Sequence, residues 1–241
     1  MGGRKGPGRV KVGSLFSGIG GRDLGLERAG MKVVWQVEKD PYCQKVLKKH
    51  WPEVPCYGDI KEIDFTTLPP VDLLCGGFPC QPVSCAGKRQ GDKDERWLWP
   101  EFYRAVCEIR PQWALAENVP GLLSADSGKL FGGVLRDLAS IGYDVVWDLL
   151  PAAAFGAPHL RYRLFIIAHL DPMRQLQPNW SIFNVRERPV YSDWWTREPG
   201  IPRVVHGVPN QMDRIECLGN AVVPQIAEWI GRKIMEATHD R

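Results

Sequence analysis

The chain has 241 residues, of which 44% are hydrophobic, and carries a formal net charge of +3. This length predicts one domain with a sizeable core, and so small a charge neither requires nor excludes a nucleic-acid partner, because a basic patch depends on how charge is distributed. Seven cysteines without paired spacing argue against a disulfide framework or a zinc site and fit a reducing cytosol.

The N-terminal residues 1–9 are basic and glycine-rich and lack the apolar core of a signal peptide, so we expect a disordered lead-in. A strand is predicted over 10–16, followed by the glycine loop 17–21 and a helix that stops near Gly30. This layout can bind a cofactor at the helix N-terminus. Because Asp23 occupies the place of the third glycine of the dinucleotide fingerprint, a tight turn without ligand fits the loop equally well.

The second predicted strand, 32–37, ends in Glu38. An acidic residue at this point commonly accepts hydrogen bonds from ribose hydroxyls, although a solvated carboxylate is an ordinary alternative. A helix is predicted over 41–49, with its proline in the first turn. A short extended segment is predicted beyond it, and Asp59 follows that segment. Asp59 could accept from the exocyclic amino group of an adenine or merely cap the following turn.

A cysteine loop, 76–84, follows the apolar strand 71–75. Its two glycines allow a sharp turn, and prolines on both sides of Cys80 stiffen the backbone. A thiol held at the end of a strand can act as a nucleophile if its pKa is lowered, whereas most free cysteines are small buried apolar residues. The polar segment 85–95 could be a lid over that thiol or a plain exposed loop.

Strands and helices continue to alternate along the chain, which predicts an α/β fold with an open, mostly parallel sheet and helices on both faces. The remaining elements are predicted as helix 99–109, strand 112–116, helix 129–141, strand 143–150, a strand through 164–168 and helix 225–237. One residue of chemical interest follows each of five strand ends: Gly18, Glu38, Asp59, Cys80 and Glu117. Ligands of open α/β sheets bind along that edge, so we expect one site there.

Periodicity is lost over 171–201, where aromatic residues alternate with arginines such as Arg186 and Arg188. Such a segment could stack bases and contact phosphates, or form the small core and rim of an irregular subdomain. The Gly219-Asn220 turn before the last helix could line a site or simply begin the helix.

Several of these motifs together resemble the cytosine-C5 DNA methyltransferase family, in the family's linear order and over nearly the whole chain. The 77–84 loop, with Glu117-Asn118-Val119 downstream, is highly specific for this family. The matching segments are 16–21, Glu38, 58–60, 77–84, 117–119, Arg161 with Arg163, and 219–224.

The resemblance implies a Rossmann-like methyltransferase fold with S-adenosylmethionine as cofactor and no metal. Glu38 would hold the ribose hydroxyls, while Asp59 and Ile60 would meet the adenine. The implied cofactor-binding residues are Phe16, Ser17, Gly18, Ile19, Gly20, Gly21, Glu38, Asp59, Ile60, Gly77, Pro79, Asn220, Ala221 and Val222.

The resemblance also implies the chemistry. A target cytosine leaves the stack of double-stranded DNA, and the Cys80 thiolate attacks C6. Protonated Glu117 donates to N3, Arg163 binds O2, and Arg161 helps to position the base, so that fixed donors stabilise the developing charge. The residues expected to contact DNA are Gln81, Ser84, Arg96, Arg186 and Arg188.

Two departures from the family pattern stand out. His159 replaces a glutamine two residues before the arginine pair, although both arginines remain. The region between that pair and the closing helix is short, so we divide the chain into a catalytic domain, 10–170 with 213–241, and a recognition region, 171–212. So short a region predicts a short or relaxed target sequence; a strict site of six or more base pairs would refute this.

Two other functions remain open at this point. The same chemistry could act on tRNA, whose loops offer splayed bases without the opening of a duplex. A catalytically silent binding module would predict damage to the thiol loop or the acid, yet Cys80, Glu117 and Arg163 are all present. The compact form resembles bacterial or phage members, which implies a cytoplasmic monomer.

Overall fold

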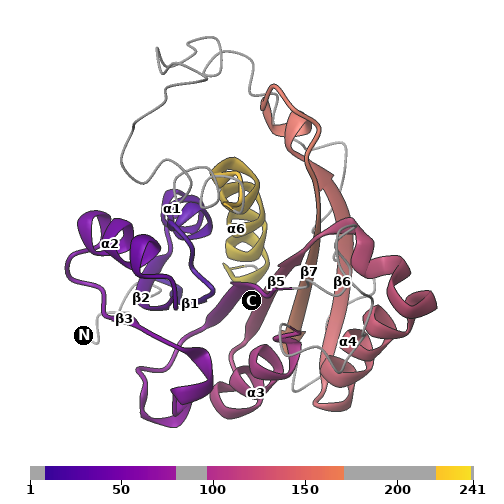
Figure 1. Ribbon diagram of the computed structural model, residues 1–241, viewed down its shortest axis with the longest axis horizontal. Helices are drawn as coiled ribbons and strands as arrows, with labels where there is room; N and C mark the ends of the chain where they lie inside the picture. Colours follow the sequence, from indigo (N-terminus) through magenta and orange to yellow (C-terminus); the bar gives the residue numbers. More distant parts are fainter. Residues whose placement is uncertain (1–8, 80–96, 171–220, 240–241) are drawn as a thin grey trace, which may run out of the picture.

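A seven-stranded sheet with helices on both faces is the framework of the computed structural model, which describes residues 9–79, 97–170 and 221–239 (Figure 1). The strand order is β3-β2-β1-β4-β5-β7-β6; β1 to β5 are parallel, and β7 is antiparallel to both neighbours. The predicted fold class is confirmed. The strands are β1 (Lys11–Leu15), β2 (Lys32–Val37), β3 (Cys56–Tyr57), β4 (Leu73–Gly77), β5 (Trp113–Asn118), β6 (Tyr143–Pro151) and β7 (Tyr162–Leu170).

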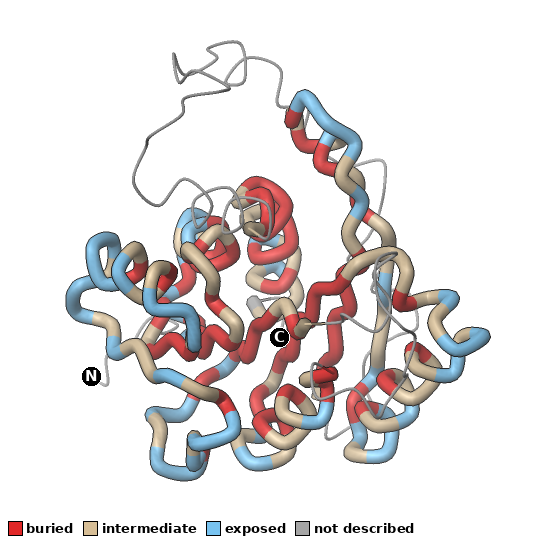
Figure 2. The backbone as a smooth tube through the Cα atoms, in the orientation of Figure 1, coloured by how far each residue is buried: buried red, intermediate tan, exposed pale blue. Residues whose placement is uncertain are grey.

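Two hydrophobic clusters lie on opposite faces of the sheet, because successive side chains of a strand point to opposite sides. On β4, Leu73 belongs to one cluster and Leu74 to the other. Helices α1 and α6 cover the first face, and α3 and α4 the second, so the strands are buried through the centre (Figure 2). The helices are α1 (Gly21–Arg28), α2 (Pro41–His50), α3 (Trp99–Ile109), α4 (Lys129–Ser140) and α6 (Pro224–His239).

Short 3-10 helices connect several of these elements: η1 (Ile60–Glu62), η2 (Phe65–Thr67), η5 (Pro120–Gly128) and η6 (Ala152–Phe155). Most predicted bounds agree with the structure to within two residues. In β5 the strand extends two residues beyond its predicted end, so Glu117 and Asn118 belong to the strand and do not follow it. None of the helices within the described ranges is long and apolar enough to cross a membrane.

Glycines allow the backbones of α1 and α6 to pack in direct contact with each other. A Cβ atom on Gly25 would come 2.6 Å from the Cβ of Ala227 and 2.8 Å from the backbone nitrogen of Glu228. A Cβ on Gly231 would come 2.8 Å from that of Ala29. This close packing also brings Val222, just before α6, against Gly21 at the start of α1. The two helices therefore hold the glycine loop and the segment before α6 together.

Gly25→Ala is expected to lower the free energy of unfolding by about 1–3 kcal/mol, because the added methyl group meets the backbone of α6 and cannot be accommodated by a side-chain rotation. Gly133→Ala on α4 is the matched control, since nothing lies within 4 Å of the added atom. In the control, the free energy of unfolding should rise by about 0.5–1 kcal/mol, because alanine favours the helical conformation more than glycine does. Urea unfolding of both variants measures this, and a stability gain at Gly25 would contradict the close helix contact.

Candidate active site

A buried network of hydrogen bonds fixes the glycine loop after β1. The Oγ of Ser17 donates to the Oγ of Ser14 at 2.9 Å, and Ser14 in turn donates to Oδ1 of Asp23 at 2.6 Å. The Nε2 of Gln36 donates to the other carboxyl oxygen of Asp23 at 2.6 Å. Asp23 is fully buried, and burial raises its pKa. The residue in place of a third glycine thus ties the loop and α1 to β1 and β2.

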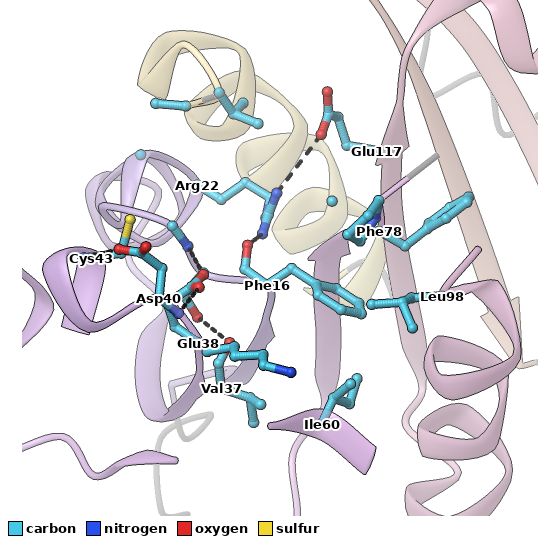
Figure 3. A pocket seen from close by; sticks show the side chains of 18 of the residues that line it. Phe16, Arg22, Val37, Glu38, Asp40, Cys43, Ile60, Phe78, Leu98 and Glu117 are labelled. Carbon is cyan, nitrogen blue, oxygen red and sulfur yellow. Dashed lines mark hydrogen bonds and ion pairs between the residues drawn. The ribbon is translucent and has the colours of Figure 1, made fainter. Parts of the chain in front are cut away.

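Glu38 at the end of β2 also fixes the loop, through hydrogen bonds to backbone nitrogens (Figure 3). Its Oε2 accepts a hydrogen bond from the backbone nitrogen of Gly18 at 2.7 Å, and its Oε1 accepts from that of Asp40 at 2.8 Å. Gly18 has a φ of 56°, in the left-handed region that favours glycine. Each carboxylate oxygen has a further lone pair with which to accept a donor from a ligand.

Asp59 belongs to the same site and caps η1, which is one of the two roles that the sequence predicts for it. Its Oδ1 accepts from the backbone nitrogen of Lys61 at 3.1 Å, and its Oδ2 accepts from the Nζ of Lys39 at 2.6 Å. The hydrogen bond from Lys39 lowers the pKa of Asp59. An ionised carboxylate therefore lies beside an exposed lysine at this point of the site.

These groups surround a cavity of about 580 Å³ at the carboxyl ends of the parallel strands. Ile19 and Gly20, both predicted to bind the cofactor, are not among its lining residues. The predicted residues that do line it are Phe16, Ser17, Gly18, Gly21, Glu38, Asp59, Ile60, Gly77, Pro79, Glu117, Arg163, Ala221 and Val222. Arg22, Lys39 and Leu98 line the cavity although the sequence analysis did not single them out. Phe78 and Asn118, which lie in matching motifs but were given no role, line it too.

Glu117 is the acidic group on the inner wall of this cavity. Its Oε1 lies 3.1 Å from Nε of Arg163, and its Oε2 lies 4.0 Å from Nη1 of Arg22. Burial raises the pKa of Glu117, and the neighbouring arginines oppose that rise. Gly77 of β4 pairs with Glu117 in the sheet, and a Cβ on Gly77 would come 2.7 Å from Nη1 of Arg22. The missing side chain leaves room for this charged group.

The two predicted arginines lie at the start of β7. Arg163 is the second strand residue, and its Nη1 also donates to the carbonyl oxygen of Tyr162 at 2.9 Å. Arg161 precedes the strand, and its buried Nε and Nη2 have no hydrogen-bond partner among the described residues. Burial lowers the pKa of Arg161, and the charge of Arg163 lowers it further. Buried donors of this kind need a partner, so they mark a place where a ligand could bind.

Arg22 is the functional candidate that the sequence analysis missed. It belongs to the first turn of α1 and is 4% exposed, although arginine side chains are mostly exposed in folded proteins. Its Nη2 donates to the carbonyl oxygens of Leu15 and Phe16, both at 2.9 Å. Only the path of the glycine loop reveals this role, because the loop turns these two carbonyls toward the helix.

The predicted residues Cys80, Gln81, Ser84, Arg96, Arg186, Arg188 and Asn220 lie outside the described residues. The described ends of the 80–96 segment lie close together, since the rings of Phe78 and Trp97 meet edge to face with centroids 5.6 Å apart. Phe78 also packs against Trp99 at 5.2 Å. Across the described ranges, no cluster of three or more histidine, cysteine or acidic side chains could hold a metal ion.

Known proteins with similar sequences and folds agree with this architecture. Type II methyltransferase M.Eco47II of Escherichia coli is 44% identical over 158 residues, covering 64% of this chain and 38% of its own length. M.NgoBI of Neisseria gonorrhoeae is 39% identical over 176 residues, covering 68% and 54%. The chain therefore spans about half or less of these curated relatives.

Among solved structures, S. pombe Dnmt2 shares the fold, with a TM-score of 0.58 and 22% identity over 79% of this chain and 59% of its own. The Entamoeba histolytica methyltransferase EhMeth shares it too, with a TM-score of 0.58 and 21% identity over 70% and 56%. The family model described as C-5 cytosine-specific DNA methylase matches residues 10–198. With most of its length matched by that model, the chain belongs to the C-5 cytosine-specific DNA methylase family.

Proposed function

We propose that this chain transfers a methyl group from S-adenosylmethionine to C5 of a cytosine flipped out of double-stranded DNA. The observation that carries the proposal is the position of Glu117 with Arg163, side by side on the wall of a cavity built from a glycine loop and Glu38. An acid and a cation at one end of a cofactor-sized cavity fit a reaction that activates a heterocyclic base. Family membership and the names of the relatives support the same activity.

The cavity fits S-adenosylmethionine in size and in the chemistry of its lining. Its volume of about 580 Å³ falls in the usual range for small-molecule sites. Glu38 can accept from two ribose hydroxyls, Asp59 can accept at the adenine end, and Phe16 and Ile60 offer apolar surface to the ring. When bound, the cofactor supplies an electrophilic methyl group on its sulfonium. We propose that Asn220, with Ala221 and Val222, closes the site.

Glu38→Ala is expected to weaken cofactor binding about 10- to 100-fold, since ~1.4 kcal/mol corresponds to a factor of ten and two charge-assisted hydrogen bonds are lost. The loss also frees the backbone nitrogen of Gly18. Isothermal titration calorimetry with S-adenosylhomocysteine measures the affinity. Glu53→Ala, which removes an exposed carboxylate, is the matched control and should bind as the wild type does. Equal affinity in both variants would contradict the role given to Glu38.

On the substrate side, we propose that the Cys80 thiolate forms a bond to C6 of the cytosine. Protonated Glu117 donates to N3 and Arg163 to O2, so the electron pair displaced by the attack is stabilised on the ring. C5 becomes nucleophilic and gains the methyl group. Loss of the C5 proton to a base then restores the ring double bond and expels the thiolate. The raised pKa of Glu117 favours the protonated form that this scheme requires.

Arg161 and the region 171–212 complete the proposed DNA site. The unpartnered donors of Arg161 can bind the extruded nucleotide once it enters. We propose that Gln81, Ser84 and Arg96 close over the DNA, while Arg186 and Arg188 contact it in the recognition region. So short a region leaves few side chains to read base edges, at about 1–3 kcal/mol for each bidentate contact. We therefore propose a short target sequence.

The proposed function is tested with the purified chain, S-adenosylmethionine labelled on its methyl group, and two substrates in parallel: mixed-sequence duplex DNA and tRNA. We expect label in the DNA, and base-resolution mapping should place 5-methylcytosine in one or a few short sequence contexts. Label in tRNA alone would replace DNA by RNA as the substrate. Label in neither nucleic acid would contradict the proposal.

A further inference from the structure

Helix α1 carries a buried arginine at an electrostatically unfavourable position. Arg22 lies in the first turn, where the macrodipole of the helix is positive and disfavours a cation. Its side chain is nevertheless 4% exposed. A charge removed from water in this way needs strong compensation from its neighbours.

The compensation comes from two directions. Nη2 donates to the carbonyl oxygens of Leu15 and Phe16, both at 2.9 Å, at the point where β1 turns into the glycine loop. Phe16 has a φ of 49°, unusual for a residue with a side chain, and the double hydrogen bond holds this conformation. Nη1 points the other way, toward Oε2 of Glu117 at 4.0 Å (Figure 3).

Each carboxyl oxygen of Glu117 therefore faces a different arginine. Oε2 faces Arg22 from α1, and Oε1 faces Arg163 from β7. In the proposed function, Arg22 lies on the cofactor side of the acid and Arg163 on the substrate side. Arg161, just before β7, is the third charged group that acts on this carboxyl among the described residues. The Arg22 side fits closely because Gly77 has no side chain to separate the two groups.

We propose that Arg22 is a positioning residue that holds Glu117 from the cofactor side while Arg163 turns to the target base. This inference rests on the proposed function, in which O2 of the cytosine takes Arg163 as its partner. Arg22 cannot turn to the base as Arg163 does, because its Nη2 is hydrogen-bonded to two backbone carbonyls of the glycine loop. It therefore keeps the acid in place and links its position to Phe16, which lines the cofactor cavity.

A fixed cation beside Glu117 has a measurable consequence. Burial raises the pKa of Glu117, and the positive charge of Arg22 opposes that rise. Removal of this charge should therefore raise the pKa further. An arginine beside a carboxylate commonly lowers the carboxyl pKa by 1–3, so we expect an upward shift of about 1–2 pH units.

The experiment is a carbon-13 NMR titration of side-chain carboxyl groups in protein labelled at glutamate, with Glu117→Gln used to assign the signal. The pKa of Glu117 should rise in Arg22→Gln, which keeps a donor for the carbonyls but has no charge, and in Arg22→Met. It should return close to the wild-type value in Arg22→Lys. The matched control is Arg104→Gln, which also removes an arginine that binds two backbone carbonyls, and it should leave Glu117 unchanged.

Kinetics supply the second readout. The kcat for methyl transfer should fall at least tenfold in Arg22→Gln and recover in part in Arg22→Lys, whereas a purely structural role would raise KM or lower stability alone. A pKa of Glu117 that is the same in folded Arg22→Gln and in the wild type would overturn the inference. The titration needs no turnover, so absence of methyl transfer by the wild type would contradict the proposed function separately.

Discussion

Replacement of Cys80 by alanine is expected to abolish methyl transfer, with a loss of about 10⁴- to 10⁶-fold, the range seen when a covalent nucleophile is removed. The physical reason is that C5 of cytosine is unreactive toward a methyl donor until a nucleophile adds at C6. Cys75 and Cys56 are poor replacements for it at neutral pH, because burial raises the pKa of Cys75 to about 11 and also raises that of Cys56. Radiolabel incorporation into duplex DNA measures the loss.

Cys56→Ala is the matched control for this variant. Cys56 lies in β3 at the edge of the sheet, is half-buried and does not line the cavity. Its replacement should leave methyl transfer close to the wild-type rate. Cys80→Ala should still bind S-adenosylhomocysteine with wild-type affinity, which separates loss of the nucleophile from loss of the fold. Methyl transfer that persists in Cys80→Ala would show that another group adds to the base, or that none does.

The second large effect is expected at Glu117. The Glu117→Gln variant keeps the shape of the side chain but cannot give up a proton, so kcat should fall by about 10²- to 10⁴-fold, the usual contribution of a positioned acid. In the wild type, the limb of the pH–rate profile that declines as pH rises should report the raised pKa of Glu117. This limb should be absent in the variant, and its persistence there would assign it to another group.

The same carboxyl should influence stability with a definite sign. Because the pKa of Glu117 is higher in the folded chain than its ordinary value of 4.5, the wild type gains stability from this group below that pH and loses it as pH rises through the raised pKa. Relative to the wild type, Glu117→Gln should thus become more stable toward neutral pH. Thermal unfolding of both proteins across that pH range measures the difference. A difference in Tm that does not vary with pH would contradict the raised pKa.

Much of the fold follows from local sequence patterns, for physical reasons that β4 and α6 illustrate. The apolar run before the cysteine loop predicts a short buried strand, and β4 is buried over Leu73 to Gly76. Ile226, Trp229, Ile230 and Ile234 recur at helical spacing, and all four are buried on α6. Since parallel strands present their carboxyl ends at one edge, the convergence of Gly18, Glu38, Asp59 and Glu117 was predictable as well.

The partners of these groups were not predictable, because they depend on where the backbone turns. Arg22 is buried and donates hydrogen bonds to two backbone carbonyls only because Phe16 adopts a positive φ. Lys39 pairs with Asp59 because β2 and β3 are parallel neighbours, so the residues that follow their ends lie close together. Asp23, noted as a departure from a glycine pattern, serves as the acceptor of a buried network. The roles of Cys80 and of 171–212 remain proposals from the sequence.

The most direct test of the central claim traps the covalent bond between Cys80 and the base. The purified chain is incubated with S-adenosylmethionine and a DNA duplex in which 5-fluorocytosine replaces cytosine at the mapped target. Fluorine cannot leave C5 as a proton does, so the thiolate is not expelled. We predict a protein–DNA adduct stable to denaturation, with the methylated base linked to Cys80 when the peptides are sequenced by mass spectrometry. No adduct on a duplex whose unmodified counterpart is methylated would contradict the mechanism.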